Sequence, residues 1–70
     1  MRIGELARRT GLSVHAIRWY EGQRLIPGVR RTAAGHREYA DWHEAWLALL
    51  DGFVPPPEEL RRAWTARDAL

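Results

Sequence analysis

The sequence predicts a small, mainly α-helical domain of about four helices with one short β-hairpin. Apolar residues recur at helical spacing in four segments, two short polar runs flank a loop that ends in glycine, and glycine or proline separates these segments. Seventy residues make a single domain, 1–70. A chain of this size buries only roughly 60% of its unfolded surface, so its core is small.

A helix, a turn and a second helix are predicted over residues 2–22. The first helix has an apolar face at helical spacing and ends near Gly11, which suits the left-handed conformation that follows a helix. Ser13 is a favourable N-cap for the second helix, and Gly22 closes it. The apolar faces consist of Ile3, Leu6 and Ala7, then Val14, Ile17 and Tyr20.

Residues 29–39 predict a β-hairpin with the three-residue loop 33–35. Two strands are not stable alone, so this hairpin must lean on the helices, as a wing does. The sequence thus predicts a winged helix-turn-helix with supporting helices in residues 41–69.

The third helix is expected to begin at Asp41 and end at Gly52, before the prolines at 55–57. Its expected buried stripe is Trp42, Ala45, Trp46, Leu49 and Leu50. The fourth helix starts at Pro57 and has an apolar face of Leu60, Ala63 and Trp64. An alternative is that part of the stripe formed by Trp42, Trp46 and Trp64 is exposed and contacts a partner.

All eleven basic residues are arginine. Residues 1–39 contain eight arginines and three acids, a net charge of +5, whereas residues 40–70 contain three arginines and six acids, a net charge of −3. A basic front half suits a polyanion, and arginine suits phosphate and guanine edges. The lack of lysine also fits the codon usage of a GC-rich genome.

The same sequence argues against several other classes of protein. It has no cysteine, no run of about 20 apolar residues and no signal-peptide pattern, so the expected compartment is the cytoplasm. His15, His36 and His43 lack a metal-binding spacing, and no arrangement of nucleophile and base suggests an enzyme. We therefore expect no metal and no cofactor.

Three segments within residues 2–39 resemble the N-terminal DNA-binding domain of the MerR family of bacterial transcription regulators. They read RIGELARRTGLS at 2–13, IRWYE at 17–21 followed by LIP at 25–27, and RT at 31–32 through GHREY at 35–39. The resemblance implies that the second helix enters the major groove and that the wing grips the flanking backbone. It also implies promoter distortion, dimerisation through a long C-terminal helix, and an effector domain beyond that helix.

The chain departs from the family pattern in four places. Trp19 replaces one of two usual tyrosines, and His36 stands where tyrosine is common in the wing. The segment after Tyr39 is shortened and interrupted by proline, and the sequence ends at Leu70 before a long helix or effector domain. It is therefore expected to be a fragment or a short stand-alone relative.

The candidate DNA-binding residues lie on the second helix and the wing. His15, Arg18, Trp19 and Gly22 share one helix face, where Arg18 could bind a guanine edge or a phosphate. The ordinary alternatives are a solvated helix face with Trp19 under the wing, and a hairpin that is charged only for solubility. The full set is Ser13, His15, Ala16, Arg18, Trp19, Tyr20, Arg30, Arg31, His36, Arg37 and Tyr39. The Tyr20 hydroxyl is expected on a phosphate, with a place in the core as the alternative.

The predicted function is sequence-specific binding of double-stranded DNA as a MerR-like regulator or its DNA-binding module. Two copies, as a homodimer or in tandem on a repeated or inverted site, and the transcription machinery are the expected partners. Two alternatives stay open: an excisionase-like factor that bends DNA for recombination, and a winged-helix adaptor that binds proteins.

Overall fold

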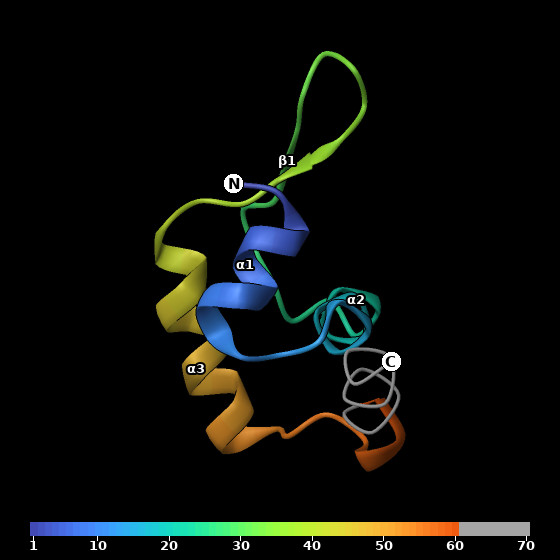
Figure 1. The fold of residues 1–70 in the computed structure, drawn as a ribbon, viewed down its shortest axis with the longest axis vertical. Coiled ribbons are helices and arrows are strands. Elements are labelled where there is room, and N and C mark those ends of the chain that lie inside the picture. The colour runs from blue at the N-terminus through green and yellow to red at the C-terminus, as the bar shows by residue number, and fades with distance from the viewer. Residues whose placement is uncertain (61–70) are drawn as a thin grey trace.

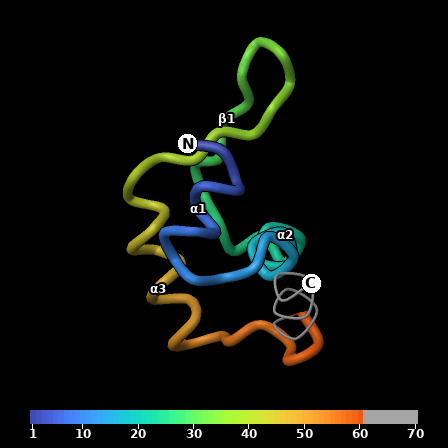
Figure 2. The backbone as a smooth tube through the Cα atoms, viewed as in Figure 1, coloured from blue at the N-terminus to red at the C-terminus, as the bar shows by residue number. Residues whose placement is uncertain are grey.

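The computed structural model describes residues 1–60 as three helices, a two-stranded hairpin and a final helical turn at 58–60. The elements are α1 (Ile3–Thr10), α2 (Val14–Gly22), β1 (Arg30–Arg31), β2 (Arg37–Glu38) and α3 (Trp42–Phe53). Helix α1 contacts both other helices, and the hairpin projects from them as a long loop (Figures 1 and 2). The expected winged helix-turn-helix is confirmed.

The turn between α1 and α2 follows the local signals of the sequence. Gly11 adopts a left-handed conformation with φ of 77°, and its N–H donates to the Ala7 carbonyl at 2.9 Å. Ser13 then caps α2, because its Oγ accepts a hydrogen bond from the Ala16 N–H at 2.9 Å. Helix α2 ends at Gly22 as expected.

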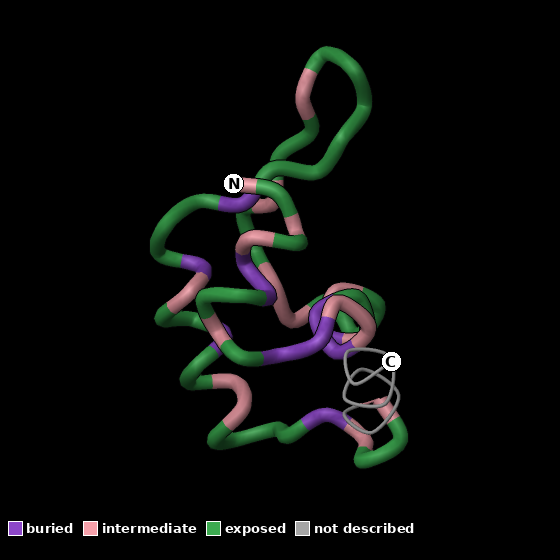
Figure 3. Tube along the Cα trace, viewed as in Figure 1, coloured by how far each residue is buried: buried purple, intermediate pink, exposed green. Residues whose placement is uncertain are grey.

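The wing is an antiparallel hairpin in which Arg30 pairs with Glu38 and Arg31 pairs with Arg37. Its strands are only two residues long, shorter than the sequence suggested. The Thr32 N–H donates to the His36 carbonyl at 2.8 Å, which closes the expected three-residue loop. Most of the wing is exposed (Figure 3), so its orientation depends on contacts at its base.

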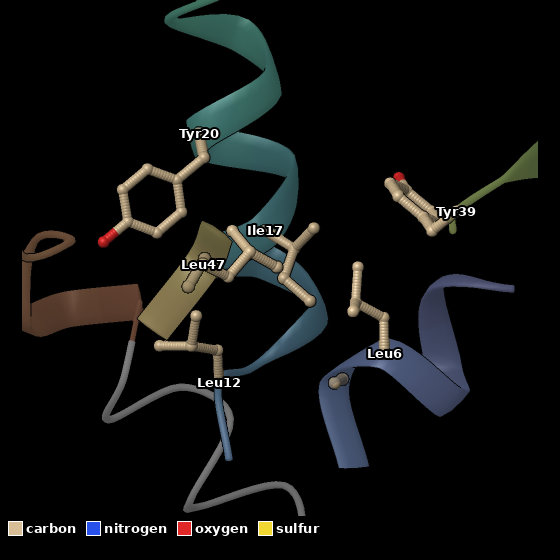
Figure 4. Packing of buried hydrophobic residues seen from close by; sticks show 8 residues of the cluster. Leu6, Leu12, Ile17, Tyr20, Tyr39 and Leu47 are labelled. Atoms are coloured by element: carbon tan, nitrogen blue, oxygen red, sulfur yellow. The ribbon is translucent and has the colours of Figure 1, made fainter. Parts of the chain in front are cut away.

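The core lies where α1, α2 and α3 meet, and its members are mostly aliphatic or tyrosine side chains. Figure 4 shows Leu6, Ile17 and Leu47 converging from the three helices. Burial of each such side chain contributes about 1.5–3 kcal/mol. The buried hydrophobic set is Leu6, Ala7, Leu12, Ala16, Ile17, Tyr20, Tyr39 and Leu47.

The expected buried stripe of α3 is wrong except at Leu50, which packs against the core. Trp42 is 49% exposed and Leu49 is 58% exposed, whereas His43 and Leu47 are fully buried. Helix α3 buries a different face from the predicted one, because His43 occupies an internal position with two hydrogen-bond partners. Its Nδ1 accepts the Ala40 N–H at 2.8 Å, and its Nε2 donates to the Pro27 carbonyl at 2.7 Å.

Both ends of α3 differ in detail from the prediction. Asp41 occupies the N-cap position but its side chain makes no capping hydrogen bond. At the other end the helix continues through Gly52 to Phe53. The fourth helix begins with a turn in which the Leu60 N–H donates to the Pro57 carbonyl at 3.1 Å. Its predicted continuation, with Ala63 and Trp64, lies outside the described residues.

Candidate nucleic-acid interface

Helix α2 has a buried face and a face turned toward solvent. Ala16, Ile17 and Tyr20 are fully buried against the core. Arg18 is exposed, and His15 and Trp19 on the same helix are half-buried. The helix therefore presents Arg18 at its surface, in the position that the sequence predicted for a base-reading or phosphate-binding side chain.

Four of the candidate side chains lie inside the protein: Ser13, Ala16, Tyr20 and Tyr39. The Tyr20 hydroxyl donates to the Val54 carbonyl at 2.6 Å, so the expected phosphate contact is replaced by a tie between α2 and the end of α3. Ala16 shares the helix face of Tyr20 because it lies four positions before it in the sequence. These buried side chains contribute to the packing beneath the exposed face of α2.

Arg18, but neither His15 nor Trp19, borders a hollow of about 320 Å³ between the start of α1, helix α2 and the wing. Four arginines from different places in the sequence line it: Arg2, Arg18, Arg31 and Arg37. His36 and the edge of Tyr39 complete its polar lining. Four arginines around one open hollow make a positive surface that suits phosphate oxygens, although Arg37 is paired with Glu21 and the Arg31 guanidinium donates to the Gly35 carbonyl at 3.0 Å.

The two faces of the wing differ in charge. Arg31 and Arg37 are opposite each other in the strand register and line the hollow beside Arg18. Arg30 is opposite Glu38, and both border a second hollow of about 420 Å³ beside Trp42. Neighbouring side chains on a strand point to opposite faces, so Arg30 does not line the same hollow as Arg31 and Arg37, although all three were candidate DNA-binding residues.

Two residues of this surface were missed by the sequence reasoning, Arg2 and Glu21. Arg2 precedes α1 and reaches the hollow only because the fold brings the start of the chain to the wing. Glu21 pairs with Arg37 at 2.8 Å and accepts a hydrogen bond from the Tyr39 hydroxyl. Charge could have singled out Arg2, but only tertiary structure reveals the partners of Glu21.

The environment of Tyr39 is electrostatically unusual for a tyrosine. Burial raises its pKa well above the ordinary value, and the hydrogen bond to Glu21 and the negative charge of Glu21 raise it further. The positive charges of Arg37 and Arg18 oppose this rise. Tyr39 therefore stays neutral and remains a hydrogen-bond donor to Glu21.

Other kinds of site find little support in the part of the chain that the structure describes. Residues 1–60 contain no group of three or more histidine, aspartate or glutamate side chains placed to hold a metal. No helix within the same residues has the length and apolar character needed to cross a membrane.

Comparison with solved structures gives a close match in fold. The match is the crystal structure of HiNmlR, a MerR family regulator lacking the sensor domain, bound to promoter DNA. The TM-score is 0.69 at 24% identity, covering 99% of this chain and 55% of that one.

Comparison with protein sequences gives transcription regulators. The chain is 46% identical over 50 residues to the HTH-type transcriptional regulator ZntR homolog of Haemophilus influenzae, covering 71% of this chain and 37% of that protein. It is 42% identical over 50 residues to the HTH-type transcriptional regulator CueR of Yersinia pestis, covering 71% and 36%. It is 49% identical over 39 residues to the mercuric resistance operon regulatory protein of Bacillus cereus, covering 56% and 30%. The chain thus spans about a third of the length of these relatives.

The family model described as "MerR family regulatory protein" matches residues 2–39, which is more than half of the chain. These are also the residues that form α1, α2 and the wing. The chain belongs to the MerR family of regulatory proteins.

Proposed function

We propose that this chain binds double-stranded DNA sequence-specifically, as the DNA-binding module of a bacterial, cytoplasmic transcription regulator. The hollow lined by Arg2, Arg18, Arg31 and Arg37 carries the proposal, because it joins α2 and the wing into one positive surface. Membership of a family of regulators favours this function over recombination and over a protein adaptor.

Two groups of side chains have different roles in the proposed complex. Arg18, with His15 and Trp19 beside it, lies on the helix that enters the major groove, where arginine discriminates guanine. Arg2, Arg31 and Arg37, with His36 near the wing loop, bind flanking phosphates, which position the protein without reading sequence. Arg30 lies on the opposite face of the wing, so it contacts a phosphate only if the DNA backbone also passes that face.

We also propose that two copies act on one DNA site and distort it between them. One module offers a short helix and a small wing, so a single copy has limited affinity. The exposed apolar side of α3, with Trp46, Leu49 and Phe53, is the surface on which a second copy would pack. Titration of a single and of a doubled DNA site would show whether two copies bind together. Contact with the transcription machinery is the alternative use of this apolar surface.

The test is selection of binding sites from random DNA, followed by titration of the selected site at two salt concentrations. Arg18→Ala should blur the selected motif, whereas Arg31→Ala should weaken all sequences alike and lower the salt dependence by roughly one phosphate contact. Arg8→Ala is the matched control, because Arg8 is exposed on α1 and does not line the hollow.

Failure of the wild type to bind any DNA at low salt would refute the proposal. Equal losses in Arg8→Ala and Arg18→Ala would show that only net charge matters and that α2 reads no sequence.

A further inference from the structure

Glu21 is a negatively charged side chain at the edge of the positive surface. It projects from the last turn of α2, and its side chain is only 12% exposed. One carboxylate oxygen pairs with Arg37 of β2 at 2.8 Å, and the other accepts the hydrogen bond of the Tyr39 hydroxyl. Glu21 thus joins α2 to two side chains at the base of the wing.

A buried carboxylate is costly unless charged or polar partners compensate it. An acid at this place also repels the phosphates that the neighbouring arginines would bind. Direct contact with DNA therefore gives no reason for its position. The two partners of Glu21 explain its position, because both lie at the base of the wing, where Tyr39 is also buried in the core.

The wing consists of two strands of two residues each and is mostly exposed. A hairpin of this size has no fixed orientation by itself. The backbone of Tyr39 bonds to that of Met1 in both directions, which holds the base of the wing beside the start of α1. The contacts of Glu21 add a tie to α2, the helix that carries Arg18.

We propose that Glu21 is a positioning residue for DNA binding: it fixes the wing relative to α2, and so sets the spacing between Arg18 and the phosphate-binding arginines of the wing. The inference rests on the proposed function, and it adds a residue that acts without touching DNA. A major-groove contact and a backbone contact reinforce each other only when their spacing matches the duplex.

Glu21→Gln separates this role from simple electrostatics, because the two predict opposite signs. If Glu21 acts only through its charge, its neutralisation removes repulsion and tightens binding to every DNA. If Glu21 positions the wing, the selected site loses affinity by roughly tenfold while random DNA changes little. Glu38→Gln is the matched control, since Glu38 is an exposed acid on the opposite face of the wing.

The position of the wing can be measured without DNA. The chain has no cysteine, so spin labels can be placed at Ala34→Cys in the wing loop and Ala48→Cys on the exposed side of α3. We expect a narrow distance distribution in the wild type and in Glu38→Gln. In Glu21→Gln and Glu21→Ala it should broaden while circular dichroism still shows folded helices.

An equally narrow distribution in the Glu21 variants, or tighter binding of Glu21→Gln to the selected site, would overturn the inference while leaving the proposed function intact. A wild type that binds no DNA would instead refute the proposed function, and with it the role of Glu21 in DNA binding.

Discussion

Single side chains join the elements of this small molecule through hydrogen bonds to backbone carbonyls or carboxylates. The Tyr20 hydroxyl donates to Val54, and the Trp46 indole N–H donates to Leu25 at 2.7 Å. No buried side-chain nitrogen or oxygen atom within residues 1–60 lacks a partner. Because the hydrophobic core is limited, the loss of one such bond should be measurable.

Tyr39 is the first case, and its ionisation makes the free energy of unfolding fall at alkaline pH. Its pKa is raised in the folded protein by burial and by Glu21, so folding favours the neutral phenol. The resulting stabilisation is complete below the unfolded pKa of about 10 and is lost as the pH rises through and above that value. Urea unfolding at pH 7, 10 and 11 should show a steep loss of stability in the wild type.

Tyr39→Phe should cost about 1 kcal/mol at pH 7, because the hydrogen bond to Glu21 is lost. Its stability should then fall less between pH 10 and 11. The chain has no lysine or cysteine, and its other tyrosine, Tyr20, is the same in both proteins, so the difference between the two profiles reports Tyr39. Parallel pH profiles for the two proteins would contradict the assigned environment of Tyr39.

His43 is the second case. It is fully buried and bonds both the Ala40 N–H and the Pro27 carbonyl. His43→Leu leaves both backbone groups without a partner, and we expect a loss of about 3 kcal/mol in the free energy of unfolding. Thermal or urea unfolding would measure it. His36→Leu, at an exposed position in the wing, should change stability little, and equal losses in the two variants would disprove the role of His43.

At the scale of elements, α1, α2 and the wing could be predicted because their signals are local. Gly11 and Ser13 mark the turn, and Gly35 with φ of 87° marks the loop of the wing. These signals are local, because glycine readily adopts a left-handed conformation and serine readily caps a helix whatever the rest of the fold.

The orientation of α3 could not be predicted in the same way. Most of its residues are apolar, so several faces fit a buried stripe equally well. The actual face follows from the hydrogen bonds of His43 to distant backbone atoms, which no local pattern reveals. The site shows the same division: Arg18 follows from helix periodicity, whereas Arg2 and Glu21 become part of the surface only in three dimensions.

The rotation of α3 can be tested by stability. Leu47→Ala should cost about 2–5 kcal/mol, because Leu47 is fully buried between the helices. Phe53→Ala should cost less than about 0.5 kcal/mol despite its larger side chain, because Phe53 is 81% exposed. Urea unfolding of the two variants would decide, and a larger loss for Phe53→Ala than for Leu47→Ala would contradict this orientation of α3.

At the scale of the whole molecule, the wing and the outward side of α2 share one positive surface, while α3 carries exposed apolar side chains elsewhere. This arrangement separates the surface proposed for DNA from the surface proposed for a second copy. It also means that DNA should stabilise the fold, because the four arginines come together only in the folded state.

DNA binding should therefore raise the melting temperature strongly. A ligand that binds only the folded state at a hundred times its Kd adds about 2.7 kcal/mol. Each kcal/mol shifts the Tm of a 60–100-residue domain by about 4–8 °C, so the selected site should raise it by about 10–20 °C. Differential scanning fluorimetry with the selected duplex, random duplex and no DNA would measure the shift. It should shrink at high salt, because phosphate binding releases counterions. An unchanged Tm at saturating DNA would show that the arginine surface does not require the folded arrangement.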